Sequence, residues 1–207
     1  MLYEYLIERY KPNEPIFVSD IDLPVSEGNL RQMFKTLCDN GKLTRFDTGI
    51  YYLPKKSRLK GGVPLGADVV MKYKYIMRNG QIDGYYSGYT FANQLGITTQ
   101  VPYMTEIVSN KASAVVREVN LKGRRILLRK ARSEINADNY RVLQFLDLLK
   151  DIEVYAEIEK EKVGERLRRY VIAEGITKVD LDQYIGQYPD RVYRNLYEMG
   201  LFNVFAS

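Results

Sequence analysis

The chain has 207 residues and a net charge of +5 at pH 7, and this length suits a small domain joined to a larger one. It contains no histidine and one cysteine, Cys38, which excludes a zinc finger, a Ser-His-Asp triad, a Cys-His pair and an intrachain disulfide. No segment approaches the roughly 20 apolar residues of a membrane helix, and the N-terminus lacks the pattern of a signal peptide. We therefore expect a cytoplasmic protein that is not an enzyme and needs no cofactor or metal ion.

The basic residues are unevenly distributed along the chain. Residues 28–60 carry eight basic residues and only two acidic ones, so this stretch alone accounts for the whole positive excess. Such a basic region suits an anionic partner, with nucleic acid as the first candidate. The eight residues are Arg31, Lys35, Lys42, Arg45, Lys55, Lys56, Arg58 and Lys60.

The first 25 residues predict three short elements. Apolar residues at helical spacing over residues 2–10 predict an amphipathic helix, which Pro12 ends because proline cannot continue a helix. Residues 16–18 predict a brief extended segment. Ser19 is the candidate cap of a very short helix, and residues 22–24 form a turn after it.

The next segment carries the clearest pattern in the chain. Ser26 is a candidate N-cap and Gly41 a candidate C-terminal stop, so a helix is predicted between them. Its apolar residues recur at i, i+3, i+4 and i+7 and form one face: Leu30, Met33, Phe34 and Leu37. The opposite face carries no acid and offers side chains that can hydrogen-bond base edges or phosphates: Asn29, Arg31, Gln32, Lys35 and Thr36.

Two short strands around a turn at residues 47–49 predict a β-hairpin after this helix. Helix, short helix, turn, longer helix and hairpin is the order of a winged helix-turn-helix, whose second motif helix enters the major groove. We therefore predict a DNA-binding domain over residues 1–56. The residues predicted to face the bases are Asn29, Arg31, Gln32 and Lys35. Those predicted to hold phosphates are Arg45, Lys55, Lys56, Arg58 and Lys60, and Ser26 and Thr36 complete the predicted DNA-binding set.

Residues 57–66 are basic and contain Gly and Pro, which predicts a linker to a second domain over residues 67–207. This domain is long enough for its own core and mixes predicted helices and strands, so the expected fold class is α+β with a helical C-terminal part. The predicted strands are residues 103–108, 114–119 and 124–130, the last two joined by a turn at Lys122-Gly123. The predicted helices are residues 68–78, 88–95, 139–149 and, with breaks near 175 and 186–189, most of the chain from 153 onward.

Residues 87–102 read SGYTFANQLGITTQVP and resemble the segment S-G-x-x-A-x-x-x-L-G-L-T/S-T-Q-V-P of AbiEi-type abortive-infection antitoxins. The stretch GIYYLP at residues 49–54 is similar to the same family, and the resemblance covers residues 1–150. One departure is Phe91-Ala92, which shifts the small residue of the pattern by one position. On the residues alone, the Thr98–Pro102 run is a polar turn entering a strand, with a structural role or a contact role.

The resemblance implies the antitoxin of a type IV toxin-antitoxin system. In such systems an N-terminal winged helix represses the antitoxin's own operon at inverted repeats in double-stranded DNA, an arrangement that suits a homodimer. A separate C-terminal domain counters a nucleotidyltransferase-like toxin without necessarily binding it. We expect no membrane partner.

Several other patterns have two readings. Asp180-Leu181-Asp182 is typical of the paired carboxylates that bind Mg²⁺ in nucleotidyl transfer, but acids at the predicted start of a helix also stabilise it, and we expect this second role. The basic clusters at 124–132 and 166–169 could contact phosphates or be solvated faces paired with acids. Cys38 is expected to be a partly buried helix residue, and the 18 tyrosines to be core aromatics.

Two alternatives to a DNA-binding repressor remain open. A winged helix can bind a partner protein instead of DNA. A metal-dependent nucleotidyl-transferring enzyme is the third hypothesis.

Overall fold

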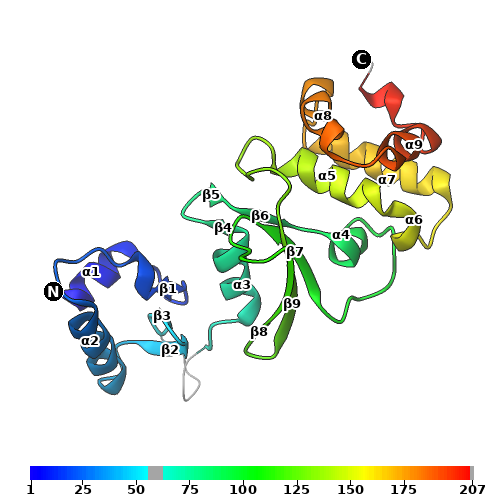
Figure 1. Ribbon diagram of the computed structural model, residues 1–207. Coiled ribbons are helices and arrows are strands. Elements are labelled where there is room, and N and C mark those ends of the chain that lie inside the picture. The colour runs from blue at the N-terminus through cyan, green and yellow to red at the C-terminus, as the bar shows by residue number, and fades with distance from the viewer. Residues whose placement is uncertain (56–62, 206–207) are drawn as a thin grey trace. The chain divides into compact units, whose positions relative to one another are not determined.

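The computed structural model describes residues 1–55 and 63–205. The chain forms two compact units, Met1–Tyr73 and Lys74–Ser207 (Figure 1). The boundary between them falls inside helix α3 (Ala67–Tyr75), whereas the sequence predicted a linker at residues 57–66. Most of that predicted linker lies outside the described residues. No helix in the described part of the chain is both long enough and apolar enough to cross a membrane.

The first unit combines short helices with a small antiparallel sheet. Its strands lie in the order β1-β3-β2, so the first strand joins the edge of the later hairpin. In chain order the elements are α1 (Leu2–Arg9), β1 (Ile16–Phe17), the 3-10 helix η1 (Val18–Asp20), α2 (Glu27–Asp39), β2 (Thr44–Asp47) and β3 (Ile50–Tyr52). The helices and strands share one apolar core, formed by Leu2, Leu6, Ile16, Leu30, Phe34, Leu43 and Leu53.

Helix α2 begins and ends as the sequence predicted. The Ser26 hydroxyl accepts a hydrogen bond from the backbone amide of Asn29 at 3.3 Å, which makes Ser26 the N-cap. Gly41 has φ +66°, and beyond it the amide of Lys42 donates to the carbonyl of Leu37. This is the long hydrogen bond of a Schellman motif, which requires the left-handed conformation that glycine adopts easily.

The second unit is built on a four-stranded sheet in the order β6-β7-β9-β8. Strands β7 and β9 are parallel, and the other pairs are antiparallel. The strands are β6 (Gly84–Tyr86), β7 (Thr105–Ser109), β8 (Val116–Leu121) and β9 (Arg124–Lys130), and helix α4 (Gly88–Gln94) connects β6 to β7. The predicted turn at Lys122-Gly123 is confirmed, with positive φ at both residues.

The part of the second unit that follows the four-stranded sheet is helical, as predicted. Helix α5 contacts β6 as well as α4, α8 and α9 (Figure 1). Seven of its 11 residues are buried. The helices are α5 (Tyr140–Lys150), α6 (Ile152–Tyr155), α7 (Lys160–Ala173), α8 (Lys178–Tyr184) and α9 (Arg191–Glu198), with 3-10 turns η2 (Ile185–Gln187) and η3 (Phe202–Val204). Their apolar faces and that of α4 form the largest core, and the predicted α+β class is confirmed.

Three local predictions differ from the structure. Ser19 is not a cap, because η1 begins at Val18 and the Ser19 hydroxyl donates to the Asp20 carboxylate instead. The helix predicted over residues 68–78 ends early, and its last residues form strand β4 (Met77–Arg78), which pairs with β5 (Gln81–Ile82). Strand β6 was not predicted, because its three residues are too few to show an alternating pattern.

Candidate nucleic-acid interface

Helix α2 has one buried face and one exposed face. The side chains of Leu30 and Phe34 are buried in the core. The centroid of the Phe34 ring lies 4.6 Å from the centroid of the Tyr51 ring in β3. Because that face is fixed, the opposite face points to solvent. All five of its predicted polar side chains are at least partly exposed: Asn29, Arg31, Gln32, Lys35 and Thr36.

Some of these side chains already have partners within α2. The Ser26 hydroxyl is engaged as the cap, and the Thr36 hydroxyl donates to the Gln32 carbonyl at 3.0 Å. The Arg31 guanidinium lies 3.1 Å from the Glu27 carboxylate, and both side chains are more than two-thirds exposed. An exposed pair of this kind contributes only about 0.3–0.5 kcal/mol, so it holds Arg31 weakly.

The remaining polar side chains of this face are free to meet a partner. Within the described part of the chain, no side-chain hydrogen bond or ion pair is found for Asn29, Gln32 or Lys35. An amide offers a donor and an acceptor together, the pairing that adenine presents, and a lysine ammonium offers donors for guanine or phosphate. The face therefore carries the chemistry that base and phosphate contacts need.

Arg45, one of the predicted phosphate contacts, makes hydrogen bonds to the turn of the β2–β3 hairpin. The exposed Arg45 side chain donates to the Asp47 carbonyl at 3.4 Å and to the Thr48 hydroxyl at 3.2 Å. Arg45 therefore also holds the hairpin turn together. Lys55 is exposed and its backbone forms an isolated bridge with Val63. The other three predicted phosphate contacts lie outside the described residues: Lys56, Arg58 and Lys60.

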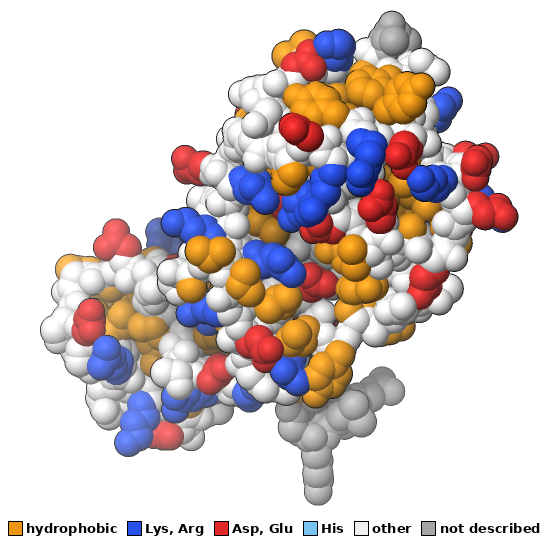
Figure 2. All heavy atoms as spheres, turned by 45° about the vertical axis from the view of Figure 1, so that its right-hand side comes forward, with side chains coloured by type: hydrophobic (Ala, Val, Ile, Leu, Met, Phe, Trp, Pro, Cys, Tyr) orange, Lys and Arg blue, Asp and Glu red, His pale blue; other side chains and the backbone are white. Residues whose placement is uncertain are grey.

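The basic cluster at residues 124–132 is paired with acids. The Arg125 guanidinium lies 2.7 Å from the Glu118 carboxylate. Figure 2 shows that Lys and Arg side chains lie among Asp and Glu side chains on the surface of the larger unit. Three arginines of this cluster therefore pair with acids, which confirms the interpretation of a solvated face paired with acids for these three residues. The other two pairs are Arg129 with Glu106 at 3.3 Å and Arg132 with Asp147 at 3.9 Å.

The cluster at residues 166–169 mostly serves the fold. Arg166 donates to the carbonyl of Leu95 at 2.9 Å, and Arg168 donates to the carbonyl of Gly200 at 3.4 Å. Arg169 lies on the exposed surface 3.9 Å from Glu165. Two of the three arginines therefore hold backbone segments distant in the sequence.

Asp180 caps helix α8. Its carboxylate accepts hydrogen bonds from the amide and hydroxyl of Thr177, and its own amide donates to the Thr177 hydroxyl, which is a reciprocal capping box. Asp182 pairs with Lys178 one turn away. The capping interpretation is confirmed for Asp180 and not for Asp182, which makes an i,i+4 ion pair within α8 instead. In the described ranges, no group of three or more acids, cysteines and histidines is placed to hold a metal ion.

Glu157, between α6 and α7, has a role that the sequence did not reveal. It accepts hydrogen bonds from the Thr99 amide at 2.7 Å, the Thr99 hydroxyl at 2.9 Å and the Gln100 side-chain amide at 2.7 Å. These donors stabilise the charged form and lower the pKa of Glu157 to about 2. The Thr99 and Gln100 side chains thus have a structural partner 57 or 58 residues away.

The prediction for Cys38 agrees with the structure, and that for the tyrosines agrees only in part, because Tyr103 and Tyr197 are largely exposed. Cys38 is partly buried in α2, and burial raises the pKa of its thiol, which disfavours the reactive thiolate. Tyr85 is a core aromatic, as expected: it is 3% exposed, and its hydroxyl donates to the Asp147 carboxylate at 2.6 Å. Burial therefore removes Tyr85 from contact with a partner.

The family of the chain follows from one match over most of its length. Residues 6–174, from within α1 to the residue after α7, match the family described as a family of unknown function (DUF6088). The match includes α2, the hairpin and the whole sheet of the second unit. No curated protein matches the chain. The chain therefore belongs to the DUF6088 family.

Proposed function

We propose that the first unit is a winged helix-turn-helix that binds double-stranded DNA, and that the protein represses transcription from its own promoter. The observation that carries the proposal is the solvent-facing side of α2, which has five polar side chains and no acid between Glu27 and Asp39. Surface helices usually carry both acidic and basic side chains. A helix that enters the major groove binds DNA more tightly without acidic side chains on its exposed face, because the phosphates repel them.

The order of elements supports this proposal. Helix α1, strand β1, η1, α2 and the β2–β3 hairpin follow one another, and β1 pairs with β3. In a winged helix, η1 and α2 would be the two helices of the motif, α2 would read the major groove, and the hairpin would be the wing. The Schellman stop at Gly41 directs the chain from α2 straight into β2, so the wing follows the reading helix closely.

The antitoxin part of the proposal rests on the resemblance of residues 49–54 and 87–102 to AbiEi-type antitoxins. We propose that the protein acts in the cytoplasm, binds inverted repeats as a homodimer and counters a nucleotidyltransferase-like toxin through its second unit. Growth of cells that express such a toxin from the neighbouring gene tests this part. Arg31→Ala should still restore growth, because α2 belongs to the first unit, and failure of the wild-type protein to restore growth would contradict it.

Fluorescence anisotropy tests the DNA-binding part. The full chain is titrated into a labelled fragment from upstream of its own gene and into a scrambled fragment, at about 50 and 200 mM salt. We expect tighter binding to the upstream fragment and a steep loss of affinity with salt, because each neutralised phosphate releases counterions. Weak binding without preference for the upstream fragment would contradict a repressor and favour the binding of a partner protein.

Lys35→Gln sharpens the same experiment. If Lys35 contacts a phosphate, the variant should bind both fragments more weakly and reduce the slope of log affinity against log salt by about 1. Lys162→Gln is the matched control, because it removes the same charge from an exposed position on α7 in the other unit. An equal effect of the two substitutions would show that only the net charge matters.

A further inference from the structure

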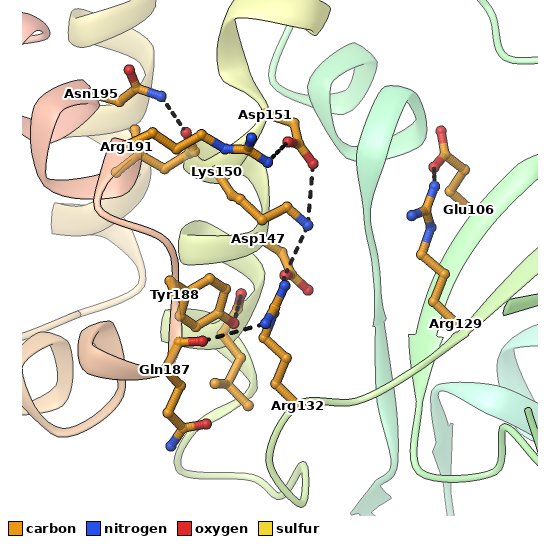
Figure 3. A network of polar contacts seen from close by, with 12 residues as sticks. Glu106, Arg129, Arg132, Asp147, Lys150, Asp151, Gln187, Tyr188, Arg191 and Asn195 are labelled. Atoms are coloured by element: carbon orange, nitrogen blue, oxygen red, sulfur yellow. Dashed lines mark hydrogen bonds and ion pairs between the residues drawn. The ribbon is translucent and has the colours of Figure 1, made fainter. Parts of the chain in front are cut away.

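The second unit contains a pocket that DNA binding by α2 does not use. Its volume is about 270 Å³, and it lies where strands β7 and β9 meet the residues before α4 and the C-terminal half of α5. Figure 3 shows the charged side chains around it: Glu106 and Arg129 from neighbouring strands on one side, and the ion pairs of α5 on the other. Residues that line it include Ser87, Glu106, Arg129, Asp147, Lys150 and Tyr155.

The carboxylates of this pocket are already paired. Glu106 accepts from the Tyr89 amide at 3.0 Å and from Arg129 at 3.3 Å. Asp147 accepts from the Tyr85 hydroxyl at 2.6 Å and lies 3.9 Å from Lys150. Each of these carboxylates is about nine-tenths buried, so their neighbours hold them in fixed positions.

Asp151, the third carboxylate of the pocket, is paired in the same way. It lies 3.2 Å from Lys150 and 2.6 Å from Arg191 (Figure 3). Four cations line the pocket against these three acids, and Lys130 has no acidic partner among the residues that the structure describes. The pocket therefore has an excess of positive charge.

Polar groups without partners also line this pocket. The Ser87 hydroxyl and the Arg129 Nε are buried and have no hydrogen-bond partner, and Ser87 is 5% exposed. The Tyr155 hydroxyl has no hydrogen bond in the described part of the chain, and Tyr155 is 9% exposed. Buried donors without partners destabilise a fold, so the Ser87 hydroxyl and the Arg129 Nε together at one pocket call for an acceptor.

The free Ser87 hydroxyl has a clear origin. Ser87 is the N-cap of α4, where a serine hydroxyl normally accepts from an amide of the first turn. Here the Glu106 carboxylate accepts from the Tyr89 amide in its place. Gly88 allows this approach, because it has φ +54° and a Cβ at position 88 would overlap the Glu106 carboxylate. The geometry thus releases the Ser87 hydroxyl from its usual capping role.

We propose that this pocket binds a small ligand through an oxyanion, a phosphate or a carboxylate. The hydroxyls of Ser87 and Tyr155 and the Nε of Arg129 can all donate to anionic oxygens, and the unpaired Lys130 adds positive charge. The apolar side chains of Val108, Val115 and Val116 line the same pocket and would contact the rest of the ligand. A volume of about 270 Å³ limits the ligand to the size of a small metabolite.

Titration of the full chain, followed by NMR, tests this site without using DNA. Sodium phosphate, sodium acetate and sodium chloride are added separately at constant ionic strength, and the backbone amides of residues 87–89 and the Arg129 Nε–H signal are recorded. We expect a saturable shift of these signals with phosphate or with acetate, and none with chloride. The anion that saturates at the lower concentration identifies the group. The absence of a saturable shift with both anions would overturn the proposal.

Two variants show whether the proposed donors bind the ion. Ser87→Ala should fold at least as stably as the wild type, because it removes a buried hydroxyl without a partner, yet weaken binding about tenfold. Arg129→Lys keeps a positive charge beside Glu106 and removes the Nε donor, and it should weaken binding as well. Ser113→Ala is the control, because Ser113 is exposed and does not line the pocket. Wild-type affinity in both pocket variants would overturn the proposal.

Discussion

The exposed face of α2 and the pocket of the second unit use polar side chains in opposite ways. On α2, Asn29, Gln32 and Lys35 lie in water, where being unpartnered costs nothing, and all three come from one helix. In the pocket, Ser87 and Arg129 hold buried donors without partners, and the residues come from segments far apart in the sequence. An unpartnered polar side chain is therefore weak evidence for a ligand on the exposed face of α2. A buried unpartnered donor in the pocket is strong evidence for one.

The largest expected effect concerns the glycine beside the pocket. Gly88→Ala should destabilise the second unit by about 2–4 kcal/mol, because the new Cβ would overlap the Glu106 carboxylate and the residue has φ +54°. Hydrogen exchange of core amides as urea is added measures each unit separately. The loss should appear in the amides of the second unit.

Gly28→Ala is the matched control in the first unit. Gly28 lies in the first turn of α2, and a Cβ at this position would have no neighbouring atom within 4 Å. Alanine there should therefore stabilise the helix by up to about 1 kcal/mol. Equal effects of Gly88→Ala and Gly28→Ala would show that Glu106 does not restrict position 88.

Arg31→Ala tests the exposed face itself. If Arg31 reads a guanine, the variant should lose about 1–3 kcal/mol of binding to the upstream DNA and relax specificity at one base pair. Stability should change little, because the Arg31–Glu27 pair is exposed. Anisotropy on the upstream fragment and on single-base variants of it gives both quantities.

Arg169→Ala is a close control for this substitution. Arg169 is exposed on α7 and faces Glu165 four residues earlier, as Arg31 faces Glu27. It should leave DNA binding unchanged. An equal loss for Arg31→Ala on the upstream and scrambled fragments would instead make Arg31 a phosphate contact.

The same substitution at two caps should give different results. Ser26→Ala removes a hydroxyl that accepts from Asn29 and should destabilise the first unit by about 1 kcal/mol. Ser87→Ala removes a cap hydroxyl that accepts nothing and should not destabilise the second unit. Thermal unfolding of both variants compares them. A loss of stability in Ser87→Ala would mean that its hydroxyl has a partner in solution, such as a buried water.

The sequence predicted the α2 face and could not predict the pocket, for a physical reason. A helix repeats every 3.6 residues, so Leu30, Phe34 and the polar residues between them show their two faces within one short segment. The pocket combines Ser87, Glu106 and Asp147, which only the pairing of strands and the packing of α5 bring together. No periodicity links such positions.

Predictions from a single residue type were correct at three positions and wrong at the candidate cap Ser19. The Ser26 cap, the Gly41 stop and the Lys122-Gly123 turn were predicted from residue type alone and are confirmed. Strand β6 and the β4–β5 pair were missed because two or three residues are too short for a pattern, and tertiary packing decides their structure.

The smallest expected effect concerns Glu157, which links the Thr99–Gln100 turn to the segment before α7. Its pKa in the folded protein is about 2, below the ordinary value of 4.5, so its hydrogen bonds stabilise the fold above pH 4.5. This stabilisation should disappear as the pH falls from 4.5 to about 2, because the carboxylate then takes up a proton. Titration of the Glu157 carboxyl carbon by NMR should give a midpoint near 2.

Glu157→Gln should lower the unfolding temperature near neutral pH, and the difference from the wild type should shrink as the pH approaches 2. Glu161→Gln, an exposed substitution on α7, controls for the loss of one negative charge and should change little. A Glu157 midpoint near 4.5 would mean that the Thr99 and Gln100 hydrogen bonds do not persist in solution. The Thr99 and Gln100 side chains would then be free to make contacts outside the chain. In that case this turn of the second unit would present unpartnered polar side chains to solvent, as the exposed face of α2 does in the first unit.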